Sequence, residues 1–297
     1  MAIIKKTDVA PERPVSIVIF GSAGVGKTSM ANTANEPVNI DTDRGFDRAC
    51  NRVDTIVASK WEDILESEGE IKNYKTAIVD TAKGMLDDFL IEYVTRQDYK
   101  LKNNKQKMYG EIGDQFKAFV NRRRAEGVDL IFIAHAKEKE VKDNTYYFPD
   151  ITGGSKDLLI RIADQIGYVS VINGKRVLSF DPTDTVVGKN TAKIPPIEIP
   201  DQYDAEFPNF MNGIIERVKK AITSQTEDQK KALEEVASLR EKISSIKDTK
   251  DADSVLSELN GKPKTMAMPL KEALSEKVKE LGFKYNKEAK KFELAQK

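Results

Sequence analysis

The chain has 297 residues, with 48 basic and 48 acidic side chains and a single cysteine. The zero net charge excludes a general basic field, so any nucleic-acid binding has to come from local patches. The lone Cys50 excludes an intrachain disulfide and a site built from several thiolates, and it fits a reducing, cytoplasmic setting. We expect neither a signal peptide nor a membrane span, because no apolar stretch is long enough for either.

Short apolar runs alternate with longer helical patterns over roughly the first 220 residues. The runs 15–20, 77–79 and 130–134 are rich in β-branched and aromatic residues and predict buried strands, whereas 115–126 shows helical spacing. Such alternation indicates an α/β core with a mainly parallel central sheet flanked by helices. Further on, Asn173-Gly174 indicates a tight hairpin.

The character of the chain changes near residue 222, which predicts a core over 1–222 and a small, mostly helical extension over 223–297. In the extension we expect a charged helix over 227–246, a polar connection over 248–264 with a short helix around 255–259, a helix over 270–281, and a hairpin made by 283–285 and 291–294.

Residues 21–28 match the phosphate-binding pattern G-x-x-x-x-G-K-[ST] at every fixed position, as Gly21-Ser22-Ala23-Gly24-Val25-Gly26-Lys27-Thr28. A predicted strand precedes this loop and a helical pattern follows it. Glycines allow several backbone N–H groups to point at one anion, and the following helix adds its positive end. We therefore predict a triphosphate site, with Lys27 at the β- and γ-phosphates and the Thr28 hydroxyl on Mg²⁺.

Asp80 ends the predicted strand 77–79, which is where a second magnesium ligand is expected. We expect its strand to be the neighbour of the P-loop strand, so that the carboxylate faces Thr28 across adjacent strand ends. The alternative is an aspartate that only caps the next helix. No Asn-Lys-x-Asp guanine motif is present in the sequence, which favours ATP over GTP.

Further segments follow in an order that resembles the RecA-like ATPases. Ile40-Asp41-Thr42-Asp43 resembles the RecA segment with the water-activating glutamate, whose place is taken here by Asp43, one methylene shorter. His135, the only histidine, ends the strand 130–134, where RecA-like ATPases place a polar sensor of the γ-phosphate. The alternatives are a polar turn at Asp43 and a structural hydrogen bond for His135.

The segment after His135 combines cations with aromatic side chains. Lys137, Lys139 and Lys142 precede Tyr146-Tyr147-Phe148, and Thr152-Gly153-Gly154 resembles the end of the second DNA-binding loop of RecA. Cations that meet phosphates and aromatics that stack on bases suit single-stranded DNA, so we expect a DNA-binding loop over 136–156. An equal alternative is that Tyr147 and Phe148 pack on the sheet and the lysines are solvated.

Taken together, the motifs are similar to the compact RecA-core ATPases of bacteriophages, which are associated with single-strand annealing and recombination. The resemblance covers roughly residues 12–220. It implies ATP and Mg²⁺ binding, single-stranded DNA binding and homo-oligomers, and a phage-encoded protein is expected in the host cytoplasm. The shorter Asp43 predicts slow hydrolysis, which we expect DNA or assembly to stimulate. The extension suggests recruitment of a single-strand-binding protein or annealase.

Related ring ATPases often complete their site with a cation from the neighbouring subunit. Lys189, with Lys193 as second choice, is our candidate for this trans-acting residue, against the alternative of a solvated lysine. The alternative function for the whole chain is an ATP-dependent switch or assembly factor that binds protein and no DNA, and the neutral net charge suits it.

Overall fold

The structure is a computed structural model that describes residues 12–286, 289 and 291–294. The chain forms two compact units, which divide between Ile222 and Thr223. Among the helices of the described residues, none combines the length and the apolar composition that a membrane span requires.

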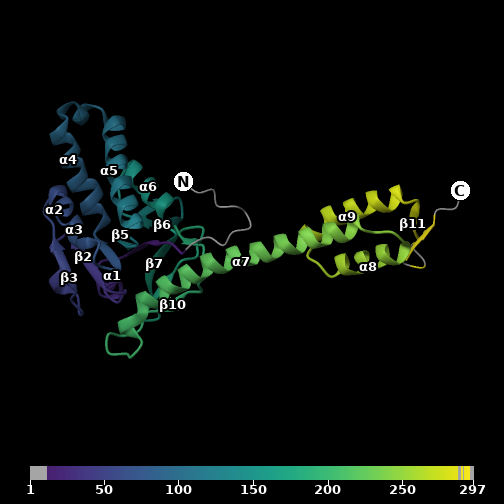
Figure 1. Ribbon diagram of the computed structural model, residues 1–297. Coiled ribbons are helices and arrows are strands. Elements are labelled where there is room, and N and C mark those ends of the chain that lie inside the picture. Colours follow the sequence, from purple (N-terminus) through teal and green to yellow (C-terminus); the bar gives the residue numbers. More distant parts are fainter. Residues whose placement is uncertain (1–11, 287–288, 290, 295–297) are drawn as a thin grey trace. The chain divides into compact units, whose positions relative to one another are not determined.

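The first unit is built on a ten-stranded sheet with the order β10-β8-β7-β1-β5-β4-β2-β3, while β6 pairs with β5 and β9 with β7 (Figure 1). The strands from β3 across to β7 are parallel, and β6, β8, β9 and β10 are antiparallel additions. The bounds are β1 Ser16–Gly21, β2 Pro37–Asp41, β3 Asp54–Val57, β4 Thr76–Asp80, β5 Asp129–Val141, β6 Asn144–Pro149, β7 Gln165–Ile172, β8 Lys175–Ser179, β9 Lys189–Asn190 and β10 Ile197–Glu198.

Helices cover both faces of this sheet, because alternate residues of the central strands point to opposite sides. In β1, Val18 and Phe20 belong to one core, whereas Ile17 and Ile19 belong to the other. The first core is closed by α2, α4, α5 and α6, and the second by α1 and the first turns of α7. The bounds are α1 Lys27–Ala31, α2 Trp61–Glu66, α3 Glu68–Ile71, α4 Leu90–Gln97, α5 Lys105–Ala125, α6 Gly153–Ile162 and α7 Phe210–Ser244, with a π-helix at Gly84–Phe89 and short 3-10 helices at Phe46–Arg48, Tyr99–Asn103 and Phe207–Asn209. The predicted α/β core with a mainly parallel sheet is confirmed.

The prediction of a loop over 136–156 is wrong about the secondary structure of this segment. β5 continues past His135 to Val141 and returns as β6, so residues up to Pro149 form a β-hairpin. Thr152 then stands at the N-cap of α6, where its backbone N–H and its hydroxyl donate to Asp87 at 2.8 and 2.7 Å. The hairpin predicted at Asn173-Gly174 is confirmed, since both residues have positive φ between β7 and β8.

The second unit contains the end of α7, α8 Thr249–Asn260, α9 Lys264–Glu280, and the hairpin of β11 Phe283–Asn286 and β12 Lys291–Leu294. The predicted hairpin is confirmed, but the predicted helix 227–246 is only the last part of α7, and the helix predicted over 270–281 begins at Lys264. The polar connection over 248–264 is wrong for most of its length. The Asp248 side chain caps α8 through the Asp251 N–H at 2.8 Å, and Ala252, Val255 and Leu259 bury one helical face.

Candidate nucleotide site

The P-loop follows β1, and its glycines are required by close approach and by backbone conformation. A Cβ at Gly21 would lie 2.7 Å from the carbonyl oxygen of Val169 in β7. Gly26 has φ +85, and a Cβ there would lie 2.6 Å from the Arg176 guanidinium. Glycine adopts left-handed backbone conformations at little energetic cost, so the shape of the loop explains why glycines stand at these positions.

Lys27 begins α1 and is only 6% exposed. Its ammonium donates to the carbonyl oxygens of Gly21 at 3.0 Å and Ser22 at 2.8 Å. Burial lowers the pKa of this lysine, while the Asp80 carboxylate acts in the opposite direction. A buried cation that is held only by two neutral oxygens is poised to exchange them for phosphate oxygens.

Thr28 and Asp80 meet directly, as the sequence predicted, because the Thr28 hydroxyl donates to Asp80 Oδ2 at 2.5 Å. The expected strand adjacency is wrong, since β5 lies between β1 and β4. The contact still forms because all three strands are parallel and end at the same edge of the sheet. Burial raises the pKa of Asp80, the hydrogen bond from Thr28 lowers it, and the nearby carboxylates of Asp43 and Asp41 raise it.

The position of Asp43 is set by a loop whose backbone is hydrogen-bonded to the Asp41 side chain. Asp41 is buried at the end of β2, and its carboxylate accepts the backbone N–H groups of Asp43 and Phe46, both at 3.0 Å. Thr81 donates its hydroxyl to Asp43 Oδ1 at 3.3 Å, and its N–H donates to the Thr42 hydroxyl at 2.8 Å. The loops after β2 and β4 are thus joined by side-chain hydrogen bonds beside Asp80.

His135 lies at the carboxyl end of the buried part of β5, in register with Gly21 of β1. It is exposed and faces a cavity of about 280 Å³ that Lys27, Thr28, Asp43 and Asp80 also line. Four of the five predicted catalytic residues therefore meet in one cavity, together with the P-loop backbone.

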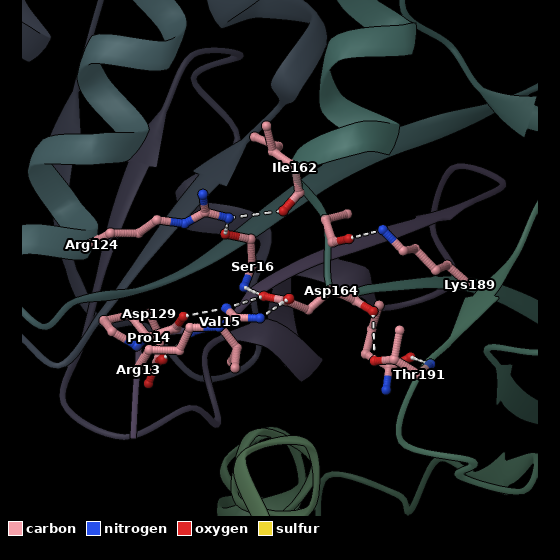
Figure 2. Close-up of polar contacts among 12 residues, drawn as sticks. Arg13, Pro14, Val15, Ser16, Arg124, Asp129, Ile162, Asp164, Lys189 and Thr191 are labelled. Atoms are coloured by element: carbon pink, nitrogen blue, oxygen red, sulfur yellow. Dashed lines mark hydrogen bonds and ion pairs between the residues drawn. The ribbon is translucent and has the colours of Figure 1, made fainter. Parts of the chain in front are cut away.

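Lys189 does not join that cavity in its own chain. It pairs with Ile166 near the start of β7, whereas the P-loop end of β1 pairs with Val169 farther along β7. Its ammonium donates to the Ala163 carbonyl oxygen, in a polar cluster with Arg13, Arg124 and Asp164 at the amino ends of the strands (Figure 2). Its predicted action on a neighbouring subunit stays a prediction.

Several residues of the site were not predicted. Arg48 and Thr81 line the cavity, Asp41 holds its loop, and Arg176 lies over Gly26 while donating to the Pro200 carbonyl oxygen at 3.0 Å. Only Asp41 carried a signal in the sequence, as an acid at a strand end. Arg48 and Arg176 reach the P-loop region through a 3-10 helix and an antiparallel strand whose placement no local pattern specifies.

The donor set fits Mg²⁺ together with a phosphate chain. A hydroxyl and a carboxylate oxygen at 2.5 Å are hard oxygen donors, and Mg²⁺ usually takes few protein ligands and completes its shell with phosphate oxygens and water. Within the described ranges no group of three or more His, Cys, Asp or Glu side chains could hold a metal ion. The fit to Mg²⁺ therefore rests on Thr28 and Asp80 acting together with a nucleotide.

The sheet, the P-loop and the Thr28–Asp80 contact define an α/β protein of the P-loop NTPase class. The model of a family described as AAA domain matches residues 13–192, which is more than half of the 297 residues. The chain therefore belongs to this AAA-domain family. The matched segment contains the P-loop, Asp43, Asp80, His135 and Lys189. A comparison with curated proteins gives no match.

Proposed function

We propose that the protein hydrolyses ATP with Mg²⁺ and uses the cycle to control its hold on single-stranded DNA. The observation that carries the ATPase proposal is the 2.5 Å contact between the Thr28 hydroxyl and Asp80, beside the buried Lys27. The test is the rate of phosphate release from ATP, with and without single-stranded DNA, for wild type and site variants.

In this proposal each side chain of the cavity has a separate task. Thr28 and Asp80 would hold the Mg²⁺, which neutralises phosphate charge when it is bound. Lys27 would leave the loop carbonyls for the β- and γ-phosphates. Asp43 would orient or deprotonate the attacking water, and the His135 imidazole can donate to a γ-phosphate oxygen in either protonation state.

The hairpin of β5 and β6 supports the DNA part of the proposal. Directly opposed residues of an antiparallel pair project from the same face, and Lys137 opposes Phe148 while Lys139 opposes Tyr146. One face of the hairpin thus carries two cations and two aromatic rings, and Glu138 and Tyr147 point to the other face. Cations beside stacking platforms are what a single strand requires.

Tyr147 is unsuited to base stacking, because its ring packs 5.5 Å from that of Tyr168 in the core of the first unit. The sequence alone left open whether Tyr147 and Phe148 pack on the sheet or stack on bases. The register favours Tyr146 and Phe148 for stacking, since they share a face with Lys137 and Lys139, and Lys156 lies over the Phe148 ring at 5.1 Å. Since the same strand carries His135 at the cavity, β5 links the nucleotide to this face.

Replacing Tyr146 by Ala is expected to weaken binding of a dT oligonucleotide by about 1–3 kcal/mol, because one stacking platform is lost. Lys139→Ala should reduce the magnitude of the log–log salt slope by about 0.7. Both are measured by fluorescence anisotropy over a salt series, with the exposed Tyr203→Ala as the matched control. Absence of DNA binding with and without ATP would favour the alternative, an ATP-dependent switch that binds only protein.

We also propose that Lys189 acts on the site of a neighbouring copy in a homo-oligomer. The cavity of about 560 Å³ that it shares with Lys117, Arg124, Arg161 and the Arg13–Asp164 ion pair supports this, since three of these side chains are further cations that suit phosphate groups. Lys189→Ala is expected to leave ATP binding intact and to abolish the rise of specific turnover with protein concentration. Turnover that keeps its concentration dependence in the variant would remove Lys189 from the mechanism.

A further inference from the structure

The second unit carries a groove of about 460 Å³ between α8, α9 and the β11–β12 hairpin, which we name the C-terminal groove. Its floor is apolar. Leu274 and Val278, one turn apart on α9, and Phe292 of β12 are nearly buried and belong to the core of this unit. Tyr285, which is 39% exposed, forms one wall of the groove, and its ring lies 5.2 Å from that of Phe292.

The hairpin that closes the groove is fixed to α8. The backbone N–H of Phe292 donates to the Asp253 carboxylate at 2.8 Å, and the side chain of Phe292 packs in the core with those of α8 and α9. The groove is therefore a formed feature of the unit, and its volume lies within the range of about 300–1,000 Å³ that is usual for ligand pockets.

The rim of the groove is cationic. Lys271 and Lys279 stand two turns apart on α9 with Ser275 between them, and Lys284 projects from β11. The Lys271 side chain donates to Asn260 at 2.7 Å, whereas the side-chain ammonium groups of Lys279 and Lys284 make no hydrogen bond or ion pair with another described residue, although Lys284 lies directly opposite Glu293 of β12. No carboxylate is among the described residues that line the groove.

We propose that the C-terminal groove binds an acidic segment of another protein, with one large apolar side chain on the floor and carboxylates on the rim lysines. The floor argues for an apolar anchor, because anchors in desolvated pockets carry most of the binding energy of interfaces. The rim argues for acidic neighbours, because charge complementarity selects partners and speeds encounter. A nucleic-acid strand fits less well, since of the three aromatic side chains that line the groove, Phe283, Tyr285 and Phe292, the last is nearly buried and meets Tyr285 edge to face, which leaves few open ring faces for bases.

The test uses the full chain without nucleotide and a fluorescein-labelled peptide of alternating Asp and Gly residues around one central Phe. We expect saturable anisotropy binding that weakens with salt, and a Kd that rises about tenfold or more when Lys279→Glu and Lys284→Glu are combined. Lys250→Glu, which makes half of the charge change of the combined variant at an exposed position outside the groove, should change Kd by less than about twofold. Peptides with Gly for Phe, or with Lys for Asp, should bind about tenfold more weakly or not at all.

A second variant separates loss of the groove from loss of the fold. Ser275 is exposed on the rim, so Ser275→Trp should fill the groove and block the peptide without changing charge or the thermal unfolding transition. Lys27→Ala should bind the peptide like wild type, which makes this inference independent of the ATPase proposal. No binding of the acidic peptide, an equal effect of Lys250→Glu, or a dT oligonucleotide that binds the groove in place of the peptide would overturn the proposal.

Discussion

Lys27→Ala is expected to reduce ATP turnover by at least about a hundredfold, because a preorganised cation at the transferred phosphate stabilises charge that grows in the transition state. The same change should leave thermal unfolding almost unaffected. The ammonium is 6% exposed and bonded to two neutral carbonyl oxygens, so its removal relieves the desolvation of a charge while it frees two acceptors. Phosphate release and circular-dichroism melting measure the two effects.

The matched control is Lys72→Ala, a lysine that is exposed at the end of α3 and outside the cavity. Asp80→Asn keeps the volume of the side chain and the acceptor for Thr28 but removes the charge that would hold the metal. We expect this variant to need more Mg²⁺ for the turnover that remains. If Lys27→Ala kept more than half of the wild-type rate, the cavity would not be the site of hydrolysis.

The P-loop and Asp80 could be predicted from the sequence because their chemistry depends on local spacing. Glycines at fixed positions, a lysine and a threonine at the head of a helix, and an acid at a strand end are each visible without long-range contacts. Strand order is different. The insertion of β5 between β1 and β4 is set by how whole strands pack, and both orders place Thr28 and Asp80 at the same edge of the sheet.

The features that could not be predicted from the sequence depend on strand register and on the path of the backbone. Tyr146 and Tyr147 are neighbours of the same type that alternate across the strand, and only the pairing with Lys139 and Glu138 and the contact of Tyr147 with Tyr168 show which of them faces the core. No local pattern indicated that Lys189, predicted to act on a neighbouring subunit, lies on a strand that joins β7 at the amino end of the sheet. Only the part of α8 around 255–259 was predicted as a helix, because the surface of α8 is polar and its buried positions are few.

The cavity and the hairpin together suggest how the nucleotide could change the hold on DNA. His135 stands where the buried part of β5 ends and the hairpin begins, and its carbonyl oxygen accepts the Asp150 N–H at 2.8 Å. The Asp150 carboxylate in turn pairs with Lys83 at 2.6 Å and Lys137 at 3.6 Å. A shift of His135 toward a γ-phosphate would therefore move Asp150 and, through its ion pair, Lys137 on the proposed DNA face.

Asp43→Asn is expected to lower turnover by about 10²–10⁴-fold while ATP binding is kept, because an amide can orient water but cannot accept its proton.

The aspartate at position 43 is one methylene shorter than glutamate, and Asp43→Glu tests whether its carboxylate reaches the attacking water. The Asp43 carboxylate is tethered by Thr81 and stands in the cavity with Asp80 and His135, so one added methylene is accommodated on the open side. We expect Asp43→Glu to hydrolyse ATP at least as fast as wild type. Asp47→Asn, on the 3-10 helix that follows the Asp43 loop but outside the cavity, should have no effect. A wild-type rate for Asp43→Asn, in a protein that Lys27→Ala inactivates, would reduce Asp43 to a turn residue and would assign the activation of water to another group of the cavity.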